Sequence, residues 1–220
     1  MHNLLLTVKS DILKFFNDNS EILFNERDLQ MHLTIWLKKS TNNYDDVDIE
    51  YYIPSKELVG YIWDSELRLD IVVRKDNEYL PIEIKYKTKK VEREIERFGE
   101  KLNHKITVIK DQSAQDIGKY GFWKDIKRLE LICERFKNVK NAISIFLTND
   151  QSYTKESSLT SSCYQFNMNE GLHSTTKHWL NEKTTCARKF EGFNLKKEYY
   201  IKWYNKTVKD IKFYYCIVEI

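Results

Sequence analysis

A carboxylate and an ammonium group stand two residues apart in a run that reads as a buried strand, YLPIEIKYKTKK at residues 79–90. Because successive side chains of a strand face opposite ways, Glu83 and Lys85 share one face, while Ile82 and Ile84 share the other. Taking an unpaired ion out of water costs roughly several kcal/mol. The two charges therefore indicate either a partner or a chemical task.

The acid-x-Lys tripeptide is common, and this chain holds three copies, at 83–85, 125–127 and 210–212. The copy at 125–127 falls in a helical pattern, where residues two apart do not face each other. The copy at 210–212 lies at the entry to a strand, and no carboxylate lies in the middle of the adjacent strand before it. Only 83–85 follows a strand with its own embedded carboxylate, Asp70, so only this copy predicts a site.

A tight turn joins the predicted strand 65–75 to the predicted strand 79–87, and such a hairpin sets Asp70 near Glu83. Two carboxylates that close repel each other unless a proton or a cation lies between them. Oxygen ligands alone suit a hard divalent ion, Mg²⁺ or Mn²⁺, better than zinc. Such an ion would polarise a phosphate, and Lys85 beside it would position an attacking water or stabilise charge on the phosphate. The strand pair thus predicts a phosphodiesterase site.

The periodicity of apolar residues gives the elements that must hold these side chains. The predicted helices are 2–17, 24–40 (with Asn25 as N-cap) and 112–136, and the predicted strands are 46–54, 65–75, 79–87, 141–150, 197–205 and 212–220, the last two pairing with each other. Residues 88–111 fit either type. This order indicates an α/β (α+β) fold with a central mixed four-stranded sheet flanked by helices. We expect a single domain over 1–220, with a core at about 24–150 and a β-rich C-terminal extension at 151–220.

Asp70, a gap of twelve residues and then Glu83-Ile-Lys85, within an α-β-β-β-α-β order, resembles the restriction-endonuclease-like, or PD-(D/E)XK, nuclease superfamily. The resemblance covers roughly residues 24–150 and implies a restriction-endonuclease-like core. It implies that Asp70 and Glu83 bind a metal ion and that Lys85 is catalytic. Many members add an acidic residue from the helix before the sheet, and Glu26 matches it as a catalytic residue and metal ligand. Gln30, one helical turn later, would face the same site and contact nucleic acid.

The chain departs from the family pattern at two places. Leu69 stands where the motif has proline, which is a common variation. Some members carry Gln-x₃-Tyr on the helix after the catalytic strand, but Gln115 and Tyr120 are one residue out of that spacing. Asp116 keeps the spacing to Tyr120 without the glutamine, so this motif is not assigned.

Lysines run off the end of the catalytic strand, and Lys87, Lys89 and Lys90 would anchor a phosphate backbone without reading its sequence. The alternative is a solvated face paired with the glutamates at 92, 94 and 96. The net charge of +3, from 36 basic and 33 acidic residues, permits a local basic groove but not a basic coat. Aromatic and basic residues at 119–124 fit a single-strand stacking surface or, as we favour from their helical spacing, the core.

The carboxylates have structural alternatives as well. Asp70, Glu83 and Lys85 would also fit an ion-pair cluster on the open face of a sheet. Glu26 would equally well complement the dipole at the first turn of its helix. Glu50, on the first strand, is within reach of the site, but we expect it to face solvent.

Other chemistries lack their motifs. The four cysteines form no CxxC pair, the five histidines form no HxH or HxxxH pair, and no GxxxxGK[ST] loop is present. The N-terminal run has neither the length of a membrane span nor the cleavage site of a signal peptide. We therefore expect a soluble, cytoplasmic protein with reduced thiols and no membrane partner.

These observations predict a Mg²⁺- or Mn²⁺-dependent nuclease that hydrolyses phosphodiester bonds in DNA, with RNA left open. Restriction, phage defence, recombination and repair are not distinguished. Cutting both strands of a two-fold site would need a homodimer, and a partner protein that supplies specificity is left open. The alternative is a catalytically silent nuclease fold that binds nucleic acid or another protein.

Overall fold

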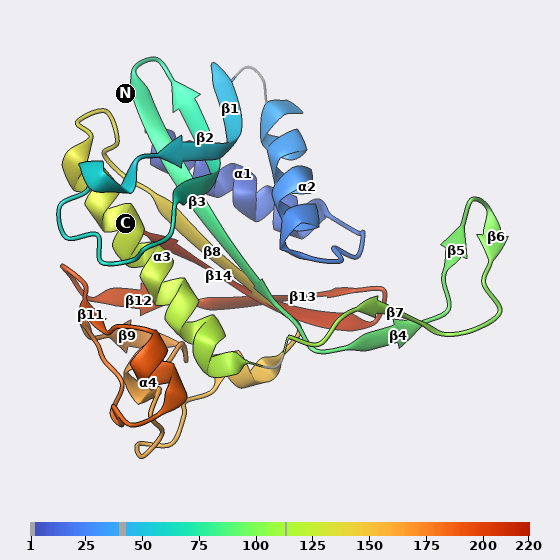
Figure 1. Ribbon diagram of the computed structural model, residues 1–220. Coiled ribbons are helices and arrows are strands. Elements are labelled where there is room, and N and C mark those ends of the chain that lie inside the picture. The colour runs from blue at the N-terminus through green and yellow to red at the C-terminus, as the bar shows by residue number, and fades with distance from the viewer. Residues whose placement is uncertain (1–2, 40–42, 113) are drawn as a thin grey trace.

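The computed structural model describes residues 3–39, 43–112 and 114–220. Its centre is a six-stranded mixed sheet in the order β1-β2-β3-β8-β14-β13. Helices α1 and α2 cover one face of this sheet, and α3 lies across the other (Figure 1). The sheet strands are β1 (Asp46–Ile53), β2 (Leu67–Lys75), β3 (Glu78–Lys87), β8 (Ile143–Thr148), β13 (Trp203–Val208) and β14 (Ile211–Glu219), and the long helices are α1 (Leu4–Asp18), α2 (Glu26–Lys39) and α3 (Gln115–Arg135).

The mixed α/β character is confirmed, but the predicted number of four sheet strands is wrong. The predicted pairing of the two C-terminal strands is confirmed for β13 and β14, and β14 also pairs antiparallel with β8. The tail therefore extends the central sheet to six strands. The first part of the predicted strand 197–205 forms the separate strand β12 (Tyr199–Ile201), which pairs with β9 (Gly171–His173). The hairpin of β2 and β3 is confirmed, and Asp76 in its turn has φ 53°, a left-handed conformation that aspartate tolerates.

Two apolar cores lie on the two faces of the sheet. One lies between the sheet and helices α1 and α2, and the other lies between the sheet and α3. On β3 the apolar residues Ile82, Ile84 and Tyr86 belong to the first core. The alternation of strand side chains therefore turns Glu83 and Lys85 toward α3.

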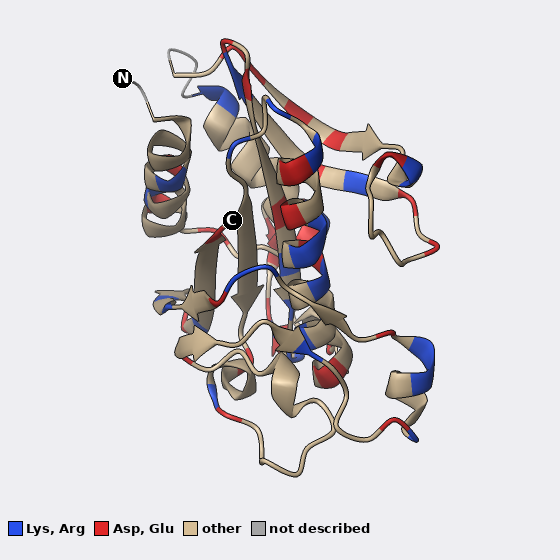
Figure 2. Ribbon diagram, turned by 90° about the vertical axis from the view of Figure 1, so that its left-hand side faces the viewer, with Lys and Arg blue, Asp and Glu red and all other residues tan. Residues whose placement is uncertain are grey.

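Helix α3 packs its aromatic residues inward. Tyr120, Phe122 and Trp123 are buried in the second core, so the core interpretation of 119–124 is confirmed and these rings form no stacking surface. Acidic and basic residues follow one another along the same helix (Figure 2). In the part of the chain that the structure describes, no helix is both long and apolar enough to span a membrane.

The ambiguous segment 88–111 is extended and forms an arm beyond the sheet (Figure 1). Its apolar residues at 91, 95, 98 and 102 resemble a helix pattern, but Phe98 and Gly99 have φ of 55° and 83° and make a turn. The arm consists of β4 (Val91–Arg93) with β7 (Ile106–Ile109), and of β5 (Glu96–Arg97) with β6 (Glu100–Lys101). The remaining elements are β9 (Gly171–His173), β10 (Thr176–Lys177), β11 (Phe193–Asn194), β12 (Tyr199–Ile201), α4 (Thr185–Lys189) and 3₁₀ turns at Ser55–Glu57, Gln151–Thr154 and Tyr164–Phe166.

The start of α2 is capped as the sequence predicts. Asn25 Oδ1 accepts a hydrogen bond from the backbone N–H of Asp28 at 2.9 Å, and the Asp28 side chain accepts one from the N–H of Phe24 at 2.9 Å. We expect Asn25→Ala to lower the free energy of unfolding by about 1 kcal/mol, because a helix N–H loses its acceptor. Urea unfolding measures this, with Asn25→Asp as the control that keeps an acceptor. Equal losses in both variants would contradict the capping role.

Candidate functional site

The candidate site lies where β2 and β3 stop pairing. The ladder between them runs from Lys75↔Glu78 to Ile71↔Ile82, and β3 then continues for five residues to Lys87 while pairing only with β8. Backbone N–H groups of β3 beyond the end of this ladder donate hydrogen bonds to carboxylates instead. The N–H of Ile84 donates to Asp70 Oδ2 at 2.6 Å, and the N–H of Tyr86 donates to Glu26 Oε2 at 2.8 Å. Acids from β2 and α2 thus line the edge of β3 that β2 has left.

Glu26 therefore lies at this edge, since its carboxylate bonds to β3, sixty residues away in the chain. Its negative charge also raises the pKa of Asp70 and of Lys85. The interpretation of Glu26 as a residue that only complements its own helix does not account for this contact.

Asp70 and Glu83 form a carboxyl pair in which each side chain acts on the pKa of the other. Burial raises the pKa of Asp70 to about 6, the charges of Glu26 and Asp125 add to the rise, and hydrogen bonds that Asp70 accepts from the Ile84 amide and from Glu83 oppose it. Burial also holds the pKa of Glu83 well above its ordinary value, and the charge of Asp125 acts in the same direction. Such a pair needs a proton or a cation to offset its repulsion.

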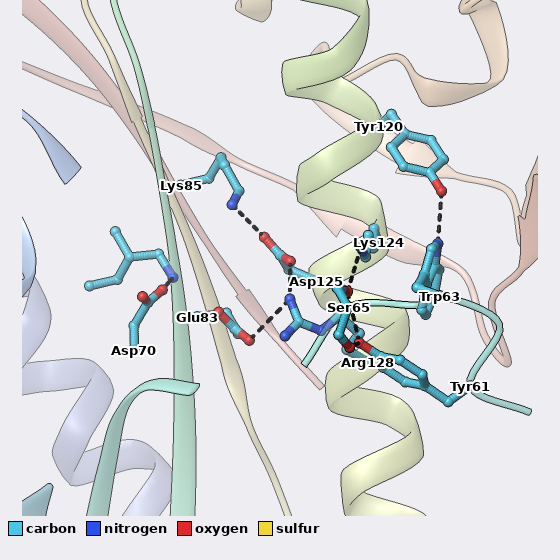
Figure 3. Close-up of polar contacts among 11 residues, drawn as sticks. Tyr61, Trp63, Ser65, Asp70, Glu83, Lys85, Tyr120, Lys124, Asp125 and Arg128 are labelled. Carbon is cyan, nitrogen blue, oxygen red and sulfur yellow. Dashed lines mark hydrogen bonds and ion pairs between the residues drawn. The ribbon is translucent and has the colours of Figure 1, made fainter. Parts of the chain in front are cut away.

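Helix α3 supplies two further charges, which were not among the predicted site residues. Lys85 Nζ lies 3.0 Å from Asp125 Oδ2, and Arg128 Nη1 lies 3.1 Å from Asp125 Oδ1. The same Arg128 nitrogen lies 3.7 Å from Glu83 Oε1. In Figure 3, Glu83 and Lys85 point from β3 toward Asp125 and Arg128 on α3. The charge of Asp125 is the main cause that raises the pKa of Lys85, so this ammonium stays protonated.

The acid-x-Lys copy at 125–127 was predicted to form no site. Its two charged residues indeed do not face each other, but Asp125 by itself belongs to the candidate site. Lys127 faces away and pairs with Glu130 at 3.3 Å, while Asp125 is 4% exposed at the side chain and faces β3. A signal was present in the sequence. Phe122, Ile126 and Leu129 form an apolar stripe on α3, and a charged residue next to such a stripe is buried with it.

Glu83, Lys85, Asp125 and Arg128 form a charge cluster between β3 and α3. A loop that precedes β2 packs against α3 beside this charge cluster. Trp63 Nε1 donates to Tyr120 Oη at 2.8 Å, and Lys124 Nζ lies 5.0 Å from the centre of the Trp63 ring (Figure 3). Burial lowers the pKa of Lys124, and the nearby positive charges of Arg128 and Lys85 lower it further. The negative charges of Asp125 and Glu83 act on this pKa in the opposite direction, so the candidate site combines acidic and basic groups.

Gln30 is placed at the site but does not face outward. It is buried, and its Nε2 donates to the backbone oxygen of Asp70 at 2.7 Å and to Glu50 Oε1 at 3.0 Å. Both donors of the amide are thus used inside the protein, and the residue fixes the position of Asp70. Glu50 itself is exposed and has φ 51°.

The three lysines predicted to contact nucleic acid lie at and beyond the end of β3. Lys87 is half-buried and lies beside Gly118 of α3. The exposed Lys89 and Lys90 pair with Asp150 Oδ1 at 3.0 Å and with Glu92 Oε1 at 2.6 Å. For Lys90, the alternative interpretation of an exposed lysine paired with one of the glutamates at 92, 94 and 96 therefore agrees with the structure.

The donor set fits a hard divalent cation that completes its coordination with water or substrate. Glu83 Oε1 is buried and has no hydrogen-bond partner, and a buried carboxylate oxygen of this kind is satisfied by a cation. Within residues 3–39, 43–112 and 114–220, no three His, Cys, Asp or Glu side chains are placed to hold a metal by themselves. Mg²⁺ is often bound by only one or two carboxylates together with water and phosphate oxygens, which matches Asp70 and Glu83.

Comparison with known proteins adds no relative. No family model matches the chain, and neither a curated protein nor a solved structure is significantly similar to it.

Proposed function

We propose that this protein is a metal-dependent nuclease with a PD-(D/E)XK-type site on a restriction-endonuclease-like core, and that it hydrolyses phosphodiester bonds, with DNA as the expected substrate. One observation carries the proposal. Asp70 and Glu83 act on each other's pKa at the point where β2 leaves β3, and Lys85 follows Glu83 on the same face of β3.

Each residue has a distinct role in this proposal. Asp70 and Glu83 would hold Mg²⁺ or Mn²⁺, which when bound polarises a phosphate and lowers the pKa of a coordinated water. Glu26 supports the site through its bond to the Tyr86 amide and its negative charge. Lys85 remains protonated beside the carboxylates, so its ammonium stabilises the charge that develops on the phosphate.

A second function, the silent nuclease fold that binds without cutting, has one observation in its favour. Glu83 and Lys85 are engaged by Arg128 and Asp125, so the two charges satisfy each other within the protein. A homodimer or a partner protein that supplies specificity remains a prediction for either function.

Cleavage of plasmid, linear duplex, single-stranded DNA and RNA with Mg²⁺ or Mn²⁺ tests the nuclease. We expect Asp70→Asn to reduce cleavage by at least about a hundredfold, because a metal ligand and its charge are lost. Asp210→Asn is the matched control, since Asp210 lies in the turn between β13 and β14 with φ 62°, which asparagine also adopts. Equal activity in both variants would refute the site. Absence of cutting, together with no Mn²⁺ binding in calorimetry, would favour the silent fold.

A further inference from the structure

A groove of about 620 Å³ opens on the same face of the sheet as the candidate site. Its walls come from β1, β2 and β3 and from the C-terminal end of α3, and they are mainly apolar and aromatic. Tyr51, Tyr79 and Phe136 supply rings, and Arg135 and Lys137 supply positive charge. Of these residues, Arg135 and Lys137 are exposed, and Tyr51 is 39% exposed.

The groove lies next to the carboxyl pair along β2 and β3. Tyr79, Pro81 and Glu83 share one face of β3, and residues two apart along a strand are separated by about 7 Å. Pro81 lines the groove, so the groove begins one side chain from Glu83. On β2, the groove residue Leu69 immediately precedes Asp70.

One side of helix α3 contributes side chains to both the charge cluster and the groove. Asp125, Arg128, Ile132 and Arg135 are spaced by three, four and three residues and therefore lie on one side of the helix. The first two belong to the charge cluster, and the last two line the groove. Cluster and groove thus lie one after the other along the same side of α3.

The size and chemistry of the groove favour an unpaired nucleotide. Volumes of roughly 300–1,000 Å³ enclose one small organic molecule, whereas a duplex does not enter a space of this size. Each base stacked on an aromatic ring contributes roughly 1–3 kcal/mol, and every base offers such a face. At the far end, Lys137 complements the negative charge of a phosphate, whereas Arg135 is paired with Glu57 Oε2 at 2.9 Å.

We propose that this groove binds an unpaired nucleotide of a single-stranded nucleic acid, with its base against Tyr51, next to the phosphate that a metal ion at Asp70 and Glu83 would bind. This inference rests on the proposed nuclease function for the neighbouring phosphate. The binding step itself is measured without metal and without cleavage.

Fluorescence anisotropy in EDTA, with a short labelled single strand and the matching duplex, tests the groove on the full chain. We expect Tyr51→Ala to weaken single-strand binding by about tenfold or more, because a stacking ring is lost. Tyr51→Phe should retain the affinity of the unchanged protein. Tyr200→Ala is the matched control, since Tyr200 on β12 is 59% exposed and does not line the groove. Circular dichroism and thermal unfolding establish that each variant is folded.

Three results would overturn the proposal: equal single-strand affinity in Tyr51→Ala and Tyr200→Ala, equal affinity of the unchanged protein for strand and duplex, or no nucleic-acid binding at all. A change of oligomeric state in Tyr51→Ala with unchanged nucleic-acid affinity would also overturn it and would assign the groove to a second copy, since β1 is an edge strand. Failure of the nuclease function is seen separately, as absence of Mg²⁺-dependent cleavage by a protein that still binds single strands through Tyr51.

Discussion

Replacing Glu83 by glutamine is expected to abolish Mg²⁺-dependent cleavage and, at the same time, to stabilise the metal-free protein. The loss of cleavage should be at least about a hundredfold, because even residues that only support metal ligands cost roughly 10–100-fold when removed. The gain in stability follows from burial. Glu83 is 4% exposed, its Oε1 has no hydrogen-bond partner, and two further carboxylates raise its pKa. A neutral side chain of the same shape removes that repulsion, at a gain of roughly 1–3 kcal/mol.

The gain should depend on pH in a defined direction. The pKa of Glu83 in the folded protein lies above the ordinary value of 4.5, so between these two values the folded state binds more protons than the unfolded state. Stability of the unchanged protein therefore falls as the pH rises through this window. Asp70, with its pKa raised to about 6, acts in the same direction in both proteins. The difference in unfolding temperature between Glu83→Gln and the unchanged protein should thus be small near pH 4 and grow toward pH 8.

Thermal unfolding across this pH range, in EDTA, measures the effect. Glu100→Gln is a suitable control, because Glu100 is exposed on the arm strand β6 and should show neither effect. A Glu83→Gln variant that loses stability at pH 8 would mean that the ion pair with Arg128 outweighs the cost of burying the carboxylate. Retained cleavage in the same variant would remove Glu83 from the metal site.

Local patterns in the sequence were enough to predict that Asp70, Glu83 and Lys85 lie close together. Glu83 and Lys85 could be assigned to one face because strand alternation is fixed, and Asp70 could be placed beside them because a two-residue turn sets the register of the hairpin. The helices around them followed from apolar spacing and from the cap at Asn25. Each of these inferences spans only a few residues of chain.

Contacts between distant segments escaped the same reasoning. Asp125 reaches Lys85 across forty residues, and its position inside the buried face of α3 depends on how that helix lies over the sheet. Gln30 matched a site position by helical spacing, but its burial and its bond to the Asp70 backbone depend on the crossing of α2 over β2. The position of β14 between β8 and β13 could not be predicted either, because the spacing of apolar residues does not determine which strands pair.

Replacing Lys85 by methionine is expected to remove cleavage and also to destabilise the protein, by about 3 kcal/mol. Lys85 is the nearest cation to Asp125 Oδ2, and the side chain of Asp125 is 4% exposed. Removing one partner of a buried pair leaves the other charge uncompensated, at a cost of roughly 3–5 kcal/mol. Arg128 remains 3.1 Å from Asp125 Oδ1, so the lower end of that range is expected. Urea unfolding gives the change in stability, and single-turnover cleavage gives the change in rate.

The double variant Lys85→Met with Asp125→Asn separates the two roles of the lysine. Neutralising Asp125 removes the uncompensated charge, so most of the lost stability should return. Cleavage should not return, because the ammonium that stabilises the phosphate is still missing. If restored stability also restored cleavage, Lys85 would act only by holding Asp125 in place, and the chemistry proposed for its ammonium would have to be given up.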